Sequence, residues 1–443
     1  MTTPVGERLA EVLERLAGRW DAAEVFHKTG RSRSVRYAGG ASCSAFHQEE
    51  GWAARAGDGR RSFFYAATGA PRPDAPWPDA DGRGLRLPPA RLVPEWTPPL
   101  DLDASLLGEN EAQAFFEGLD RELARELPGA RLARGELDDG SSEAHLASSR
   151  EVAARVRRRA ATLYLEAVGP VRGGRAVTLR AVEREARRFQ PLALARRLAD
   201  RLAIGERGTA PARDRGEFLL APPVVVSLLD ALSPLWIGPG AVERIGQLVD
   251  RRGRVGSPAL TLVDDGRLPG GVLSAPVDGE GQPTREVVLV QEGLFRQPLL
   301  AWWQATPSTG RASGCAARPG WRDLPSPGPT HFYLRPDPAL RAAALVEGLS
   351  RGYYLLDVEG APRLEEAPRR FALPVCGFAI DGGRPTGSVS GAWLVGTVTA
   401  FLNGILTAAR DLTFLPSRSG LVGAPTLLVK GLELRRRRDR SRD

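Results

Sequence analysis

Four acidic residues in the second half of the chain have side chains suited to proton transfer or metal binding. Asp264 and Asp265 are adjacent, and Asp278 and Glu280 follow after a short apolar segment. Paired carboxylates can act as general acid and base, or can bind Ca²⁺ through their oxygens. Each pair also lies beside glycine, and aspartate often hydrogen-bonds its own backbone in turns. We therefore favour turn-forming roles for these four residues.

The histidines do not form a recognisable zinc motif. None of them lies three or four residues from another, which is the spacing that brings two imidazoles to one face of a helix. A zinc site that the fold assembles from separate histidines stays open as an alternative. The four are His27, His47, His145 and His331.

The cysteines suggest neither a disulfide framework nor a nucleophile. Cys43, Cys315 and Cys376 are odd in number and form no CxxC pair, which is typical of a reducing cytoplasm. A nucleophilic Cys376 would need a neighbouring base, and no histidine is close to it in the sequence. We therefore expect a buried structural role for Cys376.

The acidic residues lie in a segment of short strands, 255–310. Alternating apolar residues predict strands over Ala259–Val263, Glu286–Val290 and Leu294–Leu300. Aspartate and glycine between these strands predict turns. The sequence thus predicts a meander of short strands with acidic turns.

This segment resembles the core of the TldD/PmbA family, the "modulator of DNA gyrase" peptidases. That family carries a run of the form SPLLTLxDDGTLPGG, then DDEGxPTxxxxLIxxGxL, then A and STG. The matching residues here are Ser257-Pro258, Asp264-Asp265-Gly266, Leu268-Pro269-Gly270-Gly271, Asp278, Glu280-Gly281, Pro283-Thr284, Gly293-Leu294, Ala305 and Ser308-Thr309-Gly310. So many matches in the same order make the resemblance specific.

The resemblance also indicates where a zinc site would lie. In the catalytic members a helix carries HExxxH, which places two histidines on one Zn²⁺ with the glutamate as base, and a cysteine near the C-terminus adds a ligand. When the sequence is aligned on the leucine pair before this motif, the three positions fall on Asp230, Ala231 and Leu235. The cysteine position falls within Pro416-Ser417-Arg418-Ser419. The chain lacks every residue of the pattern, so it looks like the PmbA/TldE-type subunit, which carries no zinc and pairs with a zinc-binding paralogue.

From this resemblance we expect a non-catalytic subunit of a heterodimeric zinc metallopeptidase that cleaves unfolded or modified peptides, such as natural-product leader peptides. We expect no catalytic and no metal-binding residue in this chain, with zinc in the TldD-like partner. The other expected partner is the peptide; neither a membrane nor nucleic acid is expected. The residues predicted to line the chamber or bind the peptide are Asp230, Asp278, Glu280, Ser308, Thr309 and Gly310.

Two other functions stay open. The chain could be a stand-alone enzyme with altered chemistry that uses Asp230 and the C-terminal serines. It could also be a peptide-binding or regulatory protein without catalysis, which holds an acidic partner through the arginine-rich tail, Arg435 to Asp443. We favour a solvated chain end as the interpretation of this tail.

The predicted fold class is α+β, with an N-terminal mixed αβ domain (1–215) of antiparallel strands and a C-terminal β-rich domain (216–443). In the first domain, short strands are expected between residues 22 and 67, and helices over 111–123 and 183–204, the second interrupted by Pro191. In the second domain, a helix is expected over Val224–Leu235. The boundary lies in a polar, Gly/Pro-containing break over 205–216.

Composition is that of an ordinary globular protein, with 42% hydrophobic and 26% charged residues and a net charge of +8. The first residues lack an apolar segment behind basic ones, so we expect no signal peptide and a cytoplasmic location. Residues 391–409 carry no charge and approach the length of a membrane span. Their Gly, Thr and Asn content favours a buried core segment instead.

Overall fold

The structure is a computed structural model that describes residues 5–72, 74, 76–80, 83–94, 105–170, 176–211, 213–365, 369–417 and 420–436. Helices and antiparallel sheets occur together, which confirms the predicted α+β class. The proposed domain boundary between residues 215 and 216 stays a prediction.

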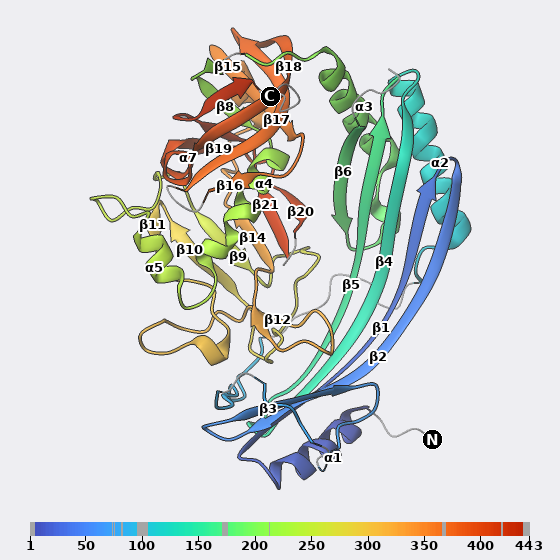
Figure 1. The fold of residues 1–443 in the computed structure, drawn as a ribbon, viewed down its shortest axis with the longest axis vertical. Coiled ribbons are helices and arrows are strands. Elements are labelled where there is room, and N and C mark those ends of the chain that lie inside the picture. Colours follow the sequence, from blue (N-terminus) through green and yellow to red (C-terminus); the bar gives the residue numbers. More distant parts are fainter. Residues whose placement is uncertain are drawn as a thin grey trace, which may run out of the picture.

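A six-stranded antiparallel sheet, here called the long sheet, is built from the first part of the chain in the order β3-β2-β1-β4-β5-β6. Its strands are β1 (Ala22–Ala38), β2 (Ala41–Gly57), β3 (Ser62–Ala67), β4 (Arg131–Ser148), β5 (Ala153–Val168) and β6 (Ala176–Glu183). Figure 1 shows its long strands curving like a bow around the remainder of the molecule. The short strands predicted between residues 22 and 67 merge into the longer β1 and β2, with β3 after them, because β1 and β2 pair with each other along their whole length.

Helices cover one face of the long sheet. They are α1 (Val5–Ala17), α2 (Glu109–Glu126) and α3 (Pro191–Arg207), with a short turn η1 (Ala186–Arg188). Leu9, Val12 and Leu16 of α1 are buried against one end, and α2 and α3 bury apolar residues against the other end. The predicted helix over 183–204 is wrong in its first part, because β6 extends to Glu183 and Pro191 begins α3. Proline suits the first turn of a helix, where its missing N–H costs no hydrogen bond.

Two further sheets contain most of the later strands. The central sheet has the order β11-β10-β9-β14-β21-β20, and the nine-stranded sheet has the order β19-β22-β8-β15-β17-β18-β23-β7, with β16 paired to β17. The central strands are β9 (Leu262–Asp265), β10 (Glu286–Gln291), β11 (Leu294–Phe295), β14 (His331–Leu334), β20 (Thr413–Pro416) and β21 (Leu421–Ala424). The others are β7 (Arg213–Asp214), β8 (Glu217–Leu220), β15 (Arg351–Val358), β16 (Arg363–Leu364), β17 (Arg370–Asp381), β18 (Arg384–Thr397), β19 (Ile405–Ala408), β22 (Leu427–Val429) and β23 (Glu433–Arg436).

One hydrophobic core joins these two sheets. Helices α4 (Pro222–Leu232) and α7 (Val398–Gly404) contribute Leu228, Leu229, Phe401 and Leu402 to it. The remaining short elements are α5 (Ala241–Gly246), α6 (Ala342–Glu347), η2 (Ser233–Trp236), η3 (Trp302–Gln304), β12 (Ala316–Ala317) and β13 (Ser326–Pro327).

The uncharged segment 391–409 forms the end of β18, α7 and β19. Leu394, Phe401, Leu402 and Ile405 of this segment lie in the core, whereas Leu406 is exposed. The core-segment prediction is therefore confirmed. Within the described residues, no helix has the length and apolar character needed to cross a membrane.

Trp321 connects the long sheet to the later part of the chain. Its side chain is 4% exposed and packs with Phe26 and Leu146 of the long sheet. A Cβ atom at Gly51 of β2 would lie 2.0 Å from the Trp321 ring, so only glycine permits this contact. The same junction holds a buried ion cluster in which Glu24 binds both Arg55 and Arg318.

Candidate functional site

Helix α4 occupies the place where the zinc-binding helix was expected, but it is shorter than predicted. It ends at Leu232 rather than Leu235, and η2 follows. Pro234 accounts for this end, because proline has no N–H to donate and its ring clashes with the preceding turn. Asp230 and Ala231 are half-buried in the last turn of α4, and Leu235 lies beyond the helix.

These positions do not fit a zinc ion. Ala231 and Leu235 have no ligating atom, and Asp230 alone cannot supply three or four ligands. Of the cysteine-equivalent positions, Pro416 and Ser417 are not thiolates, while Arg418 and Ser419 fall outside the described residues. In the described part of the chain, no group of three or more His, Cys, Asp or Glu is arranged to hold a metal. We therefore derive no catalytic step through zinc on this chain.

The face of the long sheet that carries no helix presents unusually small side chains at its middle. The register aligns Ser32 with Gly140 and Ala160, and Ser34 with Asp138 and Thr162. Because cross-strand partners point to the same side of a sheet, these residues form one continuous surface. We call this surface the chamber wall; its members are Ser32, Ser34, Asp138, Gly140, Ala160 and Thr162.

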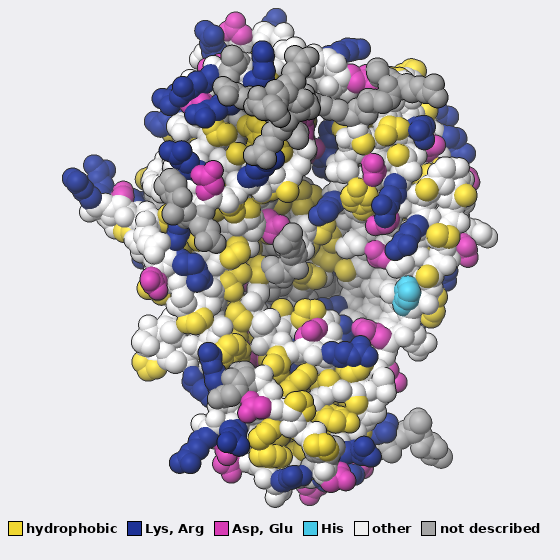
Figure 2. All heavy atoms as spheres, in the orientation of Figure 1, with side chains coloured by type: hydrophobic (Ala, Val, Ile, Leu, Met, Phe, Trp, Pro, Cys, Tyr) yellow, Lys and Arg dark blue, Asp and Glu magenta, His cyan; other side chains and the backbone are white. Residues whose placement is uncertain are grey.

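The chamber wall faces the end of β20 across open space. A cavity of about 450 Å³ is lined by Asp138 and Thr162 on one side and by Pro416 and Ser417 on the other. Helix α4 packs against β20 and β21. Figure 2 shows a hollow near the middle of the molecule, between the curved long sheet and these elements. The wall and the end of β20 therefore line one region, and α4 supports β20 from the core.

Charged and aromatic residues border the wall on one side. Arg36, Glu136 and Tyr164 form the next cross-strand row. Glu136 forms an ion pair with Arg36 at 3.8 Å and a closer one with Arg134. This border leaves the wall itself with one carboxylate, Asp138, which accepts a hydrogen bond from Ser34. The wall can therefore offer hydroxyl groups and little steric bulk to a ligand.

The structure buries Asp278 and Glu280 in the junction with the long sheet. Asp278 is 7% exposed and accepts hydrogen bonds from the backbone of Glu280, Gln282 and Ala316 at 2.9–3.0 Å. Glu280 is fully buried, and its Oε2 accepts from the backbone N–H of Trp302 at 2.7 Å. Burial raises the pKa of both carboxyl groups above the ordinary range. The turn-forming role predicted for Asp278 is confirmed, and a role in peptide binding stays a prediction.

Ser308, Thr309 and Gly310 form a tight turn just after η3. Thr309 Oγ1 accepts from the backbone N–H of Thr306 at 2.8 Å, and Gly310 has a φ of +115°, which favours glycine. Ser308 and Gly310 are exposed, and Thr309 is half-buried. This turn is linked to Glu280 through η3, since the N–H of Trp302 binds that carboxylate. Asp230 lies at the end of α4, where its backbone carbonyl accepts a hydrogen bond from Ser233 Oγ at 2.9 Å.

The fold brings two histidines together, which the sequence did not predict. His27 and His145 are cross-strand partners, and their ring centres lie 6.4 Å apart. Each contacts a carboxylate, His27 with Glu50 at 2.9 Å and His145 with Glu143 at 2.6 Å. They lie on the opposite face of the sheet from the chamber wall, because His27 is an odd number of positions from Ser32 along β1.

His331 is held neutral in the central sheet, which predicts a pH effect on stability. Its Nδ1 donates to the Asp265 carbonyl at 2.8 Å, and its Nε2 accepts from the Leu273 N–H at 3.2 Å. Burial lowers the pKa of His331 from 6.5 to about 4. The stabilisation is therefore fully present above pH 6.5 and is lost as the pH falls towards 4.

We expect His331→Asn to destabilise the protein at pH 7 by about 2.5 kcal/mol more than at pH 4.5. The reason is that only the wild type has a buried imidazole whose pKa is lower in the folded state than in the unfolded state. Urea unfolding at both pH values measures this difference. His47→Asn, at an exposed histidine, should show no such dependence. A constant destabilisation by His331→Asn would contradict the prediction.

Sequence reasoning missed the chamber wall, although a signal was present. Residues 30–34 alternate Gly, Ser and Ser with Arg31 and Arg33. In a strand this alternation places small residues on one face and arginines on the other. The pattern could have identified a face kept free of bulk, but not what lies opposite it.

Comparison with known proteins agrees with this geometry. The family pattern described as "PmbA/TldA metallopeptidase C-terminal domain" matches residues 214–436, just over half of the chain. An uncharacterized protein of Methanocaldococcus jannaschii is 30% identical over 126 residues, which span 27% of this chain and only 29% of that protein.

Solved structures extend the likeness to the whole fold. TldE from Thermococcus kodakarensis superposes with a TM-score of 0.81 at 16% identity, covering 96% of this chain and 99% of that one. A protein from Thermotoga maritima that is described as a proposed modulator of a DNA gyrase superposes with a TM-score of 0.79 at 16% identity, covering 97% of this chain and 99% of that one. At these identities the superpositions show a shared fold. Together with the family match, they establish that the chain belongs to the PmbA/TldD metallopeptidase family.

Proposed function

We propose that this chain is the non-catalytic subunit of a two-subunit zinc metallopeptidase. The observation that carries the proposal is the end of α4, where Asp230, Ala231 and Leu235 stand at the positions of the HExxxH motif of catalytic members. A hydrolytic zinc site needs three protein ligands and a water molecule. Because this chain does not supply them, the zinc would belong to a TldD-like partner.

The physical role that we propose for the chain is to complete a closed chamber around the partner's zinc. The small residues of the chamber wall leave room for an extended peptide. Hydroxyl groups such as those of Ser32 and Thr162 can hydrogen-bond a peptide backbone without selecting particular side chains. A wall with room for an extended backbone and little preference for side chains supports unfolded or modified peptides, including leader peptides, as substrates.

A cytoplasmic location is part of the same proposal. All three cysteines lie in the described part of the chain, and none forms a disulfide. This is typical of proteins kept in a reducing compartment.

The test is to purify the chain alone and together with its captured partner. We expect the lone chain to contain no stoichiometric zinc by elemental analysis and to cleave no unfolded peptide. We expect affinity capture from the native host to recover a chain of similar size that bears HExxxH, and the pair to contain zinc and cleave peptides. About one zinc per lone chain, or peptidase activity of the lone chain that Asp230→Ala abolishes, would overturn the proposal in favour of a stand-alone enzyme.

A further inference from the structure

The outer face of the nine-stranded sheet carries two rows of aligned side chains near its β7 end. In one row, Arg363 of β16 pairs with Ala372, which pairs with Val395 and then with Glu433. In the next row on the same face, Trp393 pairs with Arg435, which pairs with Arg213. The guanidinium group of Arg363 lies 4.8 Å from the centre of the Trp393 ring. Ala372 and Val395 line the base of this surface, and the arginines and Trp393 border it.

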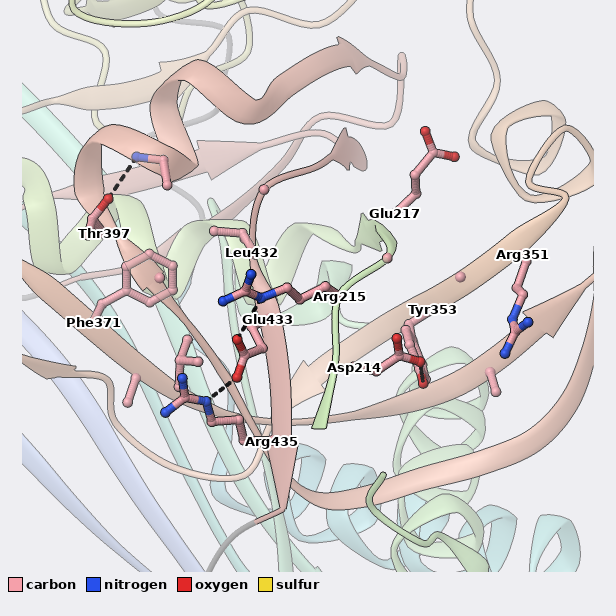
Figure 3. Close-up of a pocket in the computed structure, with 18 of the residues that line it drawn as sticks. Asp214, Arg215, Glu217, Arg351, Tyr353, Phe371, Thr397, Leu432, Glu433 and Arg435 are labelled. Atoms are coloured by element: carbon pink, nitrogen blue, oxygen red, sulfur yellow. Dashed lines mark hydrogen bonds and ion pairs between the residues drawn. The ribbon is translucent and has the colours of Figure 1, made fainter. Parts of the chain in front are cut away.

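These rows enclose a cavity of about 590 Å³ with a one-sided charge. Its described lining residues include four arginines and no carboxylate: Arg213, Arg363, Arg435 and Arg436, with Ala372, Trp393 and Val395. The cavity continues into a larger one of about 1610 Å³, with which it shares Arg363, Ala372, Val395 and Arg435. The larger cavity is lined by five arginines and five carboxylates, so the one-sided charge belongs to the smaller cavity. Figure 3 shows the larger cavity, with Arg215 and Arg435 both directed at Glu433.

The single buried carboxylate beside this cavity shows how strongly the surface attracts anions. Glu433 accepts from Arg213 at 2.8 Å, from Arg215 at 2.9 Å and from Arg435. The hydrogen bond from Arg435, aided by those from Arg215 and Arg213, lowers the pKa of Glu433 to about 2. Three guanidinium groups share this one carboxylate, and the other carboxylates of the larger cavity do not line the smaller one.

The arrangement is also unfavourable for the chain on its own. Arg435 and Arg213 are direct cross-strand partners, and like charges in this position destabilise a sheet. Arg363 has no carboxylate partner among the described residues; its described contact is with Trp393. A ligand with carboxylates would relieve this repulsion, because arginine binds carboxylates with two parallel hydrogen bonds.

We propose that this arginine pocket (Arg213, Arg363, Arg435 and Arg436 around Trp393) binds an acidic polypeptide segment. The arginines lie on β16, β23 and β7, and β17 and β18 separate β16 from β23. With about 4.8 Å between neighbouring strands, one small anion cannot contact them all. An extended chain with glutamate or aspartate at alternate positions presents carboxylates along one side and can contact several arginines at once. The site is separate from the chamber wall, which lies on the long sheet, and does not depend on the proposed peptidase role.

The test is fluorescence anisotropy with a short labelled peptide that carries glutamate at alternate positions. Its control is the same peptide with glutamine in place of glutamate. We expect the acidic peptide to bind and the glutamine peptide not to bind, with affinity falling as salt is raised, because exposed charges are screened.

Variants locate the binding site. Arg363→Glu should weaken binding about tenfold, since it removes one favourable contact and adds a repulsive one. Arg363 makes no described ion pair, so its replacement should leave the fold intact, which a thermal melt checks. Arg251→Glu, at an exposed arginine in the turn before β9, makes the same charge change elsewhere and should have no effect.

Three outcomes would overturn the inference. The first is equal binding of the glutamate and glutamine peptides. The second is an unchanged affinity in Arg363→Glu together with loss of binding on deletion of residues 437–443, which would assign binding to the tail. The third is binding of pyrophosphate, with the same dependence on Arg363, in the absence of any binding of the acidic peptide.

Discussion

Replacing Glu24 by glutamine is expected to lower the free energy of unfolding by about 3–5 kcal/mol. The Glu24 side chain is 1% exposed and binds Arg55 through two hydrogen bonds of 3.0 and 2.8 Å, and Arg318 through a third. Glutamine removes the negative charge that the buried guanidinium groups of Arg55 and Arg318 share. Because Arg318 is 294 residues away from Glu24 in sequence, the loss also weakens the junction between the long sheet and the later chain.

Thermal and urea unfolding would measure this loss. Glu49→Gln is the matched control, because the Glu49 carboxylate pairs with Lys28 at 3.3 Å but is 51% exposed. Exposed ion pairs contribute little, so the control should lose less than about 1 kcal/mol. Equal losses in the two variants would show that the buried cluster does not hold the junction together.

The effect of Glu24 should also depend on pH. Burial alone would raise the pKa of Glu24, but the attraction of Arg318 and Arg55 outweighs it and lowers the pKa from 4.5 to about 2. A lowered folded-state pKa gives stability that is present above pH 4.5 and is lost as the pH falls towards 2. The difference between wild type and Glu24→Gln should therefore shrink below pH 4.5.

Thr162→Trp is expected to reduce kcat/KM of the assembled peptidase at least about tenfold, on the proposed function. Thr162 is half-buried on the chamber wall and lines the cavity of about 450 Å³ opposite Pro416. An indole there fills space that an extended peptide would occupy, and small displacements of a bound substrate reduce the rate steeply. The change leaves the helix-covered face of the long sheet untouched.

Peptide cleavage by the reconstituted pair measures this effect, with partner binding and zinc content as checks. Gln48→Trp places the same side chain at an exposed position on the opposite face of the long sheet, and should preserve activity. Unchanged activity in Thr162→Trp, with the pair intact, would remove the chamber wall from the substrate path.

Local interactions were predictable from the sequence. The Asp278 turn depends on hydrogen bonds to residues two and four positions away, and such contacts form whatever the rest of the chain does. The helix expected over 111–123 likewise formed, as part of α2. The predictions that failed, such as the start of α3 and the breaks within β1 and β2, concerned places where long-range pairing or a permissive proline position decided the outcome.

The sequence by itself determined that α4 carries neither histidine nor cysteine, whatever the fold around it. Only the tertiary structure decided which residues act together. Side chains alternate between the two faces of a strand, so the register selects the small residues of the chamber wall and aligns Arg435 with Arg213. A shift by one residue would reverse both surfaces. That register depends on strands and helices distant in sequence, and spacing along the chain does not specify it.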